Sequence, residues 1–144
     1  MNTSILPAVG DLVGRVLLAF LFVMEALSKL SAYDLAAKYT AAFGVPTQLL
    51  PLAIAVELLG GAMIAFGWHT RLASLALAAF CLAAAVIFHT RFGDRNQLIH
   101  FEKDLALAGA FLIVCVRGAG RYSVDAMELR PTARGKSAPG TKPT

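Results

Sequence analysis

The chain has 144 residues, which is the length of one domain, and 58% of them are hydrophobic while only 15% are charged. A soluble domain of this size needs more polar surface, and the mean hydropathy of +0.67 therefore favours an integral membrane protein. The formal net charge is +4, but no basic stripe with interleaved aromatic residues is present, which argues against a nucleic-acid partner.

Four apolar blocks separated by short polar breaks predict four membrane-spanning helices. They cover about residues 10–30, 48–66, 72–88 and 101–116, each near the ~20 residues with which a helix crosses ~30 Å of hydrocarbon. The first block lacks the basic start of a secretory signal, and Arg15 interrupts it, so a retained span is expected. The fold class predicted is all-α, a four-helix transmembrane bundle over residues 1–121, followed by a basic, disordered cytoplasmic tail over residues 122–144.

The connection between the first two spans predicts a short amphipathic helix in the membrane interface. Leu35, Tyr39 and Phe43 recur at helical spacing. Gly44 is a candidate C-terminal cap, and Pro46 cannot continue a helix.

The other two connections and the basic residues predict the orientation in the membrane. Residues 67–71 are short enough to force an antiparallel hairpin, and residues 89–100 are expected to form a polar loop. Four spans place both termini on one side, where Arg71, Arg117 and Arg121 lie near the span ends. The positive-inside rule therefore predicts that both termini lie in the cytoplasm, where the basic tail could contact anionic lipid.

Charged residues inside the first span require an explanation, because a charge near the bilayer centre costs at least ~2.5–3.5 kcal/mol on insertion scales. Asp11, Arg15, Glu25 and Lys29 fall within an arc of about 80° on a helix, which points them into a protein interior. Asp11 with Arg15 and Glu25 with Lys29 are also i,i+4 pairs. The alternative is that these charges lie near the helix ends and extend to the headgroups.

Glu57 lies near the middle of the second span, where its short side chain cannot extend to the headgroups. Either it carries a proton, or it pairs with a cation from another helix. The candidate cations are Arg15, Lys29 and Lys103. Both a structural ion pair and a functional, proton-carrying carboxyl remain open.

The start of the fourth span brings a second group of polar side chains. His100, Lys103 and Asp104 are expected on the non-cytoplasmic side of the membrane, together with His89, Glu25 and Lys29. This group could form a proton-conducting pocket or bind a quinone headgroup. Two histidines with carboxylates could also hold a metal, but the tight ligand spacing of known sites is missing, so no metal is expected.

The cysteines and glycines suggest packing roles. Cys81 and Cys115 lie in separate apolar blocks without a CxxC motif, and the expected offset of ~9 Å along antiparallel helices is too large for a disulfide. Small residues allow helices to approach closely within the bundle or in a dimer, and we assign this role to the pairs Gly10 with Gly14 and Gly60 with Gly61.

Three segments together resemble the DoxX family of four-helix bacterial inner membrane proteins. The segments read GRVLLAFLFVMEALSKL, ELLGGAMIAFGWHTRLASLALA and FEKDLALAGAFLIVCVRGAGRYSVDA. The family pattern matches at Arg15, Lys29, Glu57, Gly60, Gly61, Arg71, Lys103, Gly118, Gly120 and Arg121. The run Glu102, Lys103 and Asp104 departs from it, because relatives commonly carry a Lys followed by Asn here, and this chain therefore has an extra acid. The resemblance implies association with membrane redox complexes, thiosulfate- or thiol-linked electron transfer to quinone, and resistance to oxidative stress.

These observations lead to two hypotheses about function. The first is a membrane subunit of a quinone-linked oxidoreductase or oxidative-stress redox complex, with redox partner subunits or a homo-oligomer as its assembly. Its polar pocket would comprise Glu57, Lys103 and Glu25, and the proposed cofactor contacts are Arg15, Lys29, His100 and Asp104. The second is a non-catalytic membrane scaffold whose buried charges only specify helix packing. A transporter is disfavoured, since no broken helix or inverted repeat is evident.

Overall fold

The computed structural model describes residues 5–128, and every regular element in this range is helical. The prediction of an all-α membrane protein is therefore confirmed. The elements are α1 (Ile5–Ser31), α2 (Tyr33–Ala42), the 3₁₀ turn η1 (Thr47–Leu49), α3 (Leu50–Phe66), α4 (Thr70–Phe88), α5 (Arg95–Arg117) and α6 (Val124–Glu128).

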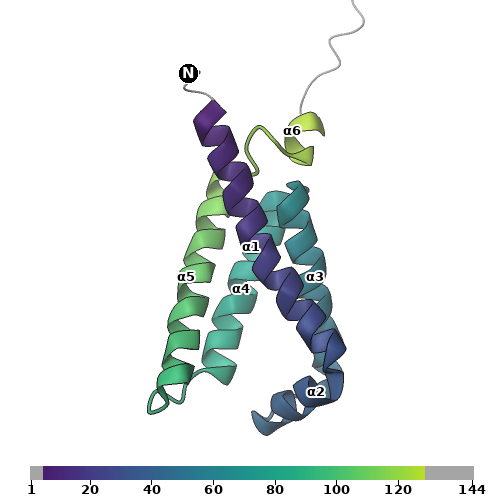
Figure 1. Cartoon of the computed structure of the whole chain (residues 1–144), viewed down its shortest axis with the longest axis vertical. Helices are drawn as coiled ribbons and strands as arrows, with labels where there is room; N and C mark the ends of the chain where they lie inside the picture. Colours follow the sequence, from purple (N-terminus) through teal and green to yellow (C-terminus); the bar gives the residue numbers. More distant parts are fainter. Residues whose placement is uncertain (1–4, 129–144) are drawn as a thin grey trace, which may run out of the picture.

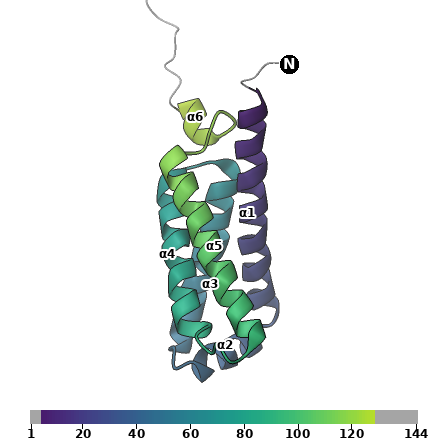
Figure 2. The same ribbon diagram turned by 90° about the vertical axis from the view of Figure 1, so that its left-hand side faces the viewer.

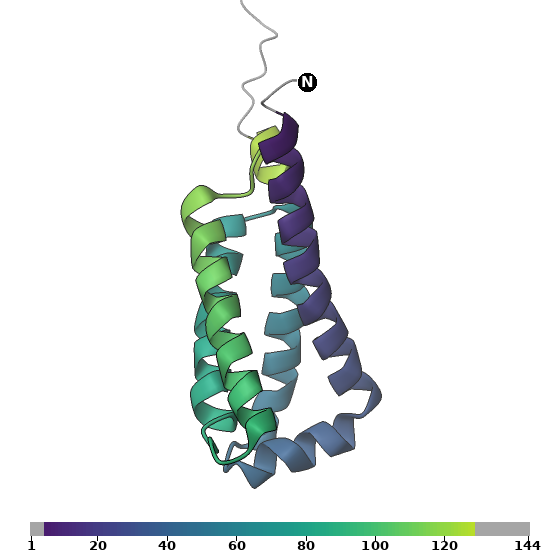
Figure 3. The same cartoon turned by 60° about the vertical axis from the view of Figure 1, so that its left-hand side comes forward.

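The four long helices form two pairs that meet along one side. α1 packs on α3, α4 packs on α5, and α3 joins the pairs by packing on α4 (Figure 1). α1 and α5 diverge toward the end of the molecule where α2 lies (Figures 1 and 3). The beginning of α1 and the short α6 lie at the opposite end (Figure 2). The bundle is therefore closed at one end and splayed at the other.

The core fills the centre of the bundle with small and aromatic side chains. Phe22 of α1 and Phe111 of α5 meet edge to face, with ring centroids 5.2 Å apart. Leu77 of α4 and Ile64 of α3 are fully buried beside them. Gly60 of α3 lies against Leu77, since an added Cβ would be 3.0 Å from the Leu77 side chain. The predicted packing role of Gly60 and Gly61 thus agrees with the structure.

Within residues 5–128, three helical segments are long and apolar enough to cross a membrane, namely Ile5–Ser31, Thr47–Phe66 and Thr70–Phe88. α5 is also long, but its first half carries several charged residues. A fourth crossing by α5 therefore stays a prediction.

The predicted helix between the first two spans is α2. It ends at Ala42, and Gly44 follows in a left-handed conformation with φ of +75°. Tyr39 and Phe43 pack on Phe88 at the end of α4, with ring centroids 5.8 and 5.4 Å from it. This aromatic contact holds α2 across the splayed end of the bundle.

The connection before α5 is shorter than the sequence suggested. We expected a polar loop from residue 89 to residue 100, but α5 begins at Arg95 and His100 lies within it. The reason is the N-cap Asp94, whose carboxylate accepts a hydrogen bond from the Asn96 N–H at 2.9 Å. The polar residues of this segment therefore stand on a helix face and point in defined directions.

Part of the segment predicted to be a disordered tail is packed against the bundle. Ser123 is buried, and α6 follows it. The Asp125 carboxylate accepts hydrogen bonds from the N–H groups of His69 at 2.7 Å and Thr70 at 3.0 Å, while its own N–H donates to the Gly67 carbonyl at 2.9 Å. Asp125 thus caps the start of α4, and the prediction was wrong for residues 122–128. The rest of the tail lies outside the described residues.

Asp125 provides a test of this cap. Burial would raise the pKa of its carboxyl, but hydrogen bonds from Thr70 and His69 outweigh that effect and lower it. The stabilisation is therefore present above the unfolded pKa of about 4 and is lost as the pH falls through the folded pKa. Asp125→Ala should destabilise the protein by about 1 kcal/mol at pH 7 and by much less at low pH.

The measurement is the thermal unfolding of both proteins in detergent, followed by circular dichroism at pH 7 and in acid. Glu128→Ala is the control, because Glu128 is exposed on the same short helix. Equal losses for Asp125→Ala at both pH values would contradict the assigned cap.

Candidate functional site

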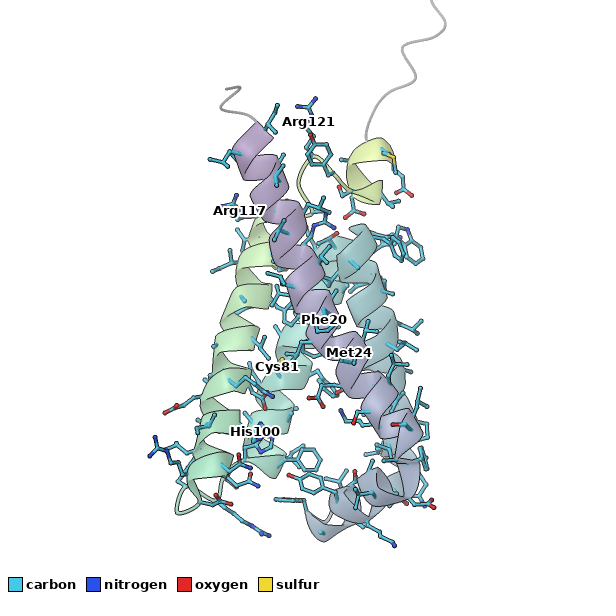
Figure 4. The ribbon with its side chains drawn as sticks, viewed as in Figure 1. Phe20, Met24, Cys81, His100, Arg117 and Arg121 are labelled. Carbon is cyan, nitrogen blue, oxygen red and sulfur yellow. The ribbon has the colours of Figure 1, made fainter. Side chains whose placement is uncertain are left out.

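A cavity of about 690 Å³ lies between the two helix pairs at the splayed end of the bundle. Its walls are apolar and include Leu21 and Phe22 of α1, Phe80 of α4 and Leu107 of α5. Its polar lining comes from α1 through α5, including Glu25, Lys29, Tyr39, Glu57, His89, Gln97, His100, Lys103 and Asp104. Figure 4 shows His100 on α5 at this end of the bundle and Cys81 on α4 nearer its middle. The cavity therefore combines a lipid-like interior with a concentrated set of titratable groups.

An ion pair between α1 and α3 lines one side of the cavity. The Lys29 ammonium lies 2.9 and 3.0 Å from the two carboxylate oxygens of Glu57. Glu57 is only 3% exposed. Lys29 also contacts Glu25 at 3.3 Å, and Glu25 is half exposed. Among the three candidate cations for Glu57, the structure therefore selects Lys29. The predicted pairing of Glu25 with Lys29 agrees with this geometry.

Small residues bring Glu57 close enough to α1 for this pair to form. Gly61 lies one turn after Glu57, and a Cβ there would be 3.2 Å from Val23 and 3.3 Å from the Ala19 carbonyl oxygen. A larger side chain at this position would push α3 away from α1. The glycine thus sets the distance over which Lys29 reaches Glu57.

A second polar group lies across the cavity, where α4 meets α5. The His89 ring lies 2.8 Å from the Gln97 side-chain oxygen through Nδ1 and 3.7 Å from Asp104 through Nε2. His100 stacks on His89, with ring centroids 5.1 Å apart. Lys103 also lines the cavity, and its ammonium has no carboxylate within 4 Å among the described residues. This side of the cavity therefore offers a cationic donor that is not already paired.

Arg15 does not belong to this site, which corrects our grouping of it with the cofactor contacts. It is 2% exposed at the opposite end of the bundle, where its guanidinium donates to the carbonyls of Ile64 at 2.9 Å and Ala65 at 3.2 Å and to that of Tyr122. The carbonyls of Ile64 and Ala65 lie in the last turn of α3, where the dipole end of the helix favours a cation. Gly67 is required here, since a Cβ would lie 2.5 Å from the Arg15 Nη1.

The predicted pair of Asp11 with Arg15 is also absent from the described residues. Asp11 instead lies 3.2 Å from Arg117 of α5. The i,i+4 spacing permitted the first pair, but the carbonyl groups at the end of α3 hold Arg15 away from it. Sequence spacing within one helix cannot reveal such competing partners on other helices.

The cysteines and the other candidate ligands form no disulfide and no metal site within the described residues. Cys81 is buried on the cavity wall, Cys115 is half-buried, and both are free. No group of three or more histidine, cysteine or acidic residues within residues 5–128 could hold a metal ion. Within the run from Glu102 to Asp104 that departs from the family pattern, Glu102 is exposed and does not line the cavity, whereas Lys103 and Asp104 do.

Sequence reasoning missed Gln97 and Tyr39 as cavity residues. Gln97 was assigned to a loop, and only the N-cap at Asp94 turns it toward His89. Tyr39 was assigned to the membrane interface, and its place on the cavity follows from the way α2 crosses the splayed end. Neither position carries a local sequence signal beyond helical spacing.

The fold and the site define a helical membrane protein with a cavity in one half of its bundle. The cavity is polar on two sides and apolar between them. The DoxX family model matches residues 10–90. The chain is also 38% identical over 120 residues to the inner membrane protein YqjF of Escherichia coli K12, across 83% of this chain and 92% of that protein. The chain belongs to the DoxX family. No solved structure matches it.

The ion pair can be tested by a double-mutant cycle. Lys29→Met leaves a carboxylate buried without its cation and should destabilise the protein by about 3 kcal/mol. Glu57→Gln in the same chain removes the unpaired charge, so the double variant should recover most of that loss. The measurement is the unfolding of all four proteins in mixed micelles. Additive losses in the double variant would show that the two side chains do not interact.

Proposed function

We propose that the cavity binds the headgroup of a membrane quinone and that the chain is the membrane subunit of a redox complex. The observation that carries the proposal is that the cavity has apolar walls and two polar sides. Lys29 and Glu57 lie on one polar side, and Lys103 and His100 lie on the other. A ligand that fits this lining needs an apolar body and oxygen acceptors. Pockets of about 300–1,000 Å³ hold ligands of headgroup size, so the volume is adequate.

Hydrogen-bond donors on the α5 side support the fit. Lys103 provides an ammonium that no carboxylate within the described chain engages, and His100, which also lines the cavity, provides a ring nitrogen. Both groups can donate to a carbonyl oxygen. Phe80 and Leu107 on the walls supply apolar contacts.

The same lining supplies groups that can hold and pass protons. A bound quinone would contribute two-electron chemistry that requires two protons. Glu57 and Asp104 are carboxyl groups on opposite sides of the cavity, and His89 contacts Asp104. Lys29 fixes the position of the Glu57 carboxylate, while Gln97 fixes the ring of His89. These contacts orient each proton-carrying group before any ligand is bound.

The electrons would come from a partner subunit. The chain has two cysteines, which do not pair, and so it offers no dithiol couple of its own. We therefore assign it the role of a membrane component that receives reducing equivalents from a redox protein and passes them to quinone.

A specific observation also favours the scaffold hypothesis. Glu57 is fully paired with Lys29, and Arg15 serves only to join helix ends. Buried charges of this kind can specify which helices pack together without any chemistry. A scaffold would need Lys29 and Glu57 only as a pair, whereas a quinone site needs Lys103 and the carboxyl of Glu57 individually.

The test is to purify the protein in mild detergent and to measure the quinone that is extracted per protein. We expect a near-stoichiometric amount in the native chain and at least a tenfold loss in Lys103→Met and Glu57→Gln. Lys38→Met is the matched control, because Lys38 is exposed on α2 and does not line the cavity. Unfolding temperatures would confirm that each variant is folded.

No quinone above the detergent–lipid background in the native chain would overturn the proposal and favour the scaffold. Equal retention by all four proteins would show that the quinone is associated lipid. Loss in Lys103→Met with an unchanged unfolding temperature would support the assigned pocket.

We further propose that the chain lies in the bacterial inner membrane with both termini in the cytoplasm, so that the cavity faces the other side. The membrane-compatible helices and the named location of the Escherichia coli relative support the membrane, and the positions of Arg71, Arg117 and Arg121 support the orientation. Alkaline phosphatase fused to the C-terminus should be inactive, and a fluorescent protein at the same position should fold. The opposite result would reverse the orientation.

A further inference from the structure

A second recess lies between α1 and α5 at the closed end of the bundle, away from the cavity. It has a volume of about 250 Å³. Gly10, Gly14 and Leu18 of α1 form one wall, and Ala110 and Ile113 belong to the other. We call this recess the α1–α5 groove.

No side chain within residues 5–128 fills the groove. A Cβ added at Gly10 or Gly14 would meet no atom within 4 Å, in contrast to Gly60 and Gly61, which pack against other helices. Gly10 and Gly14 therefore do not serve close packing within the described bundle, and their predicted role in a dimer stays a prediction. Their missing side chains instead leave the groove open along α1.

Cationic side chains surround the same groove. Arg117 lies on its rim, and its side chain is 61% exposed although it contacts Asp11 at 3.2 Å. Arg15 also lines it, is 2% exposed, and has no hydrogen-bond partner for its Nε among the described residues. Arg121 lies at the same end of the molecule (Figure 4). Asp11 is the one carboxylate in the groove lining, so the lining carries an excess of positive charge.

We propose that the α1–α5 groove is a binding site for an anionic phospholipid, with its phosphate at Arg117 and one acyl chain along Gly14 and Ile113. Along α1 and α5 the groove changes from a polar rim to an apolar floor. A phospholipid at the membrane surface changes in the same order, from its polar headgroup to its apolar acyl chains. The charge excess selects an anionic headgroup over a zwitterionic one.

Asp11 sharpens the proposal because it competes with the phosphate for Arg117. If the pair of Asp11 with Arg117 only stabilises the fold, removing either partner should have the same effect. If Arg117 holds a phosphate, the two variants should act in opposite directions. Arg117→Gln should lower the retained anionic lipid about fivefold, and Asp11→Asn should raise it.

The acyl-chain part of the site has its own variant. Gly14→Leu places a side chain in the groove without a clash, since nothing lies within 4 Å of its Cβ. Gly109→Leu is the matched control, because Gly109 is equally open and exposed on α5 but lines neither the groove nor the cavity. Gly14→Leu should lower lipid retention about tenfold, and Gly109→Leu should leave it unchanged.

The experiment reconstitutes the full chain and each variant in vesicles of mixed phosphatidylglycerol and phosphatidylcholine, extracts them in mild detergent, and measures retained phospholipid by native mass spectrometry. We expect one phosphatidylglycerol per chain. Equal retention of both lipids, no effect of Gly14→Leu, or parallel effects of Asp11→Asn and Arg117→Gln would each overturn the site. A change of oligomeric state in Gly14→Leu without lipid loss would assign the groove to a second copy instead.

Discussion

The ion pair between Glu57 and Lys29 is the interaction on which the arrangement of the bundle depends. A hydrocarbon environment offers no water to a buried carboxylate, so Glu57 must find its cation inside the protein. Lys29 supplies it from α1, and Gly61 permits the two helices to approach. This contact draws α1 to α3. α4 and α5 pack on each other, and the cavity lies between the two pairs at the end where they diverge.

The opposite end of the molecule is closed by a different set of polar contacts. Arg15 joins α1 to the last carbonyls of α3 and to the chain that follows α5. Asp125 ties the same following segment to the first N–H groups of α4. Two helix ends, the C-terminus of α3 and the N-terminus of α4, are thereby satisfied by two side chains from distant parts of the sequence. These contacts join the helices at the closed end, while the cavity lies at the splayed end.

The seam between α1 and α5 is divided into two parts by these constraints. Phe22 and Phe111 meet in the core, and Asp11 meets Arg117 at the helix ends. The groove lies between those two contacts, and the cavity lies beyond Phe22 toward α2. The two recesses differ in character because α1 presents glycines to one and charged side chains to the other. The same face of α1 thus lines both the groove and the cavity.

The sequence by itself determined the class of protein, the positions of the apolar helices and the residues that must lie inside. Apolar blocks of membrane length, a carboxylate at the centre of one block and glycines one turn after it are local features, and they act through transfer free energy and helix geometry. They were enough to expect α2 and the inward position of Glu57, and to name Lys29 among three possible partners. The tertiary structure alone decided which cation Glu57 binds, where Arg15 lies, and that Asp94 and Asp125 cap helices. Those outcomes depend on competition among partners from different helices, and no spacing within one helix records the distances that settle it.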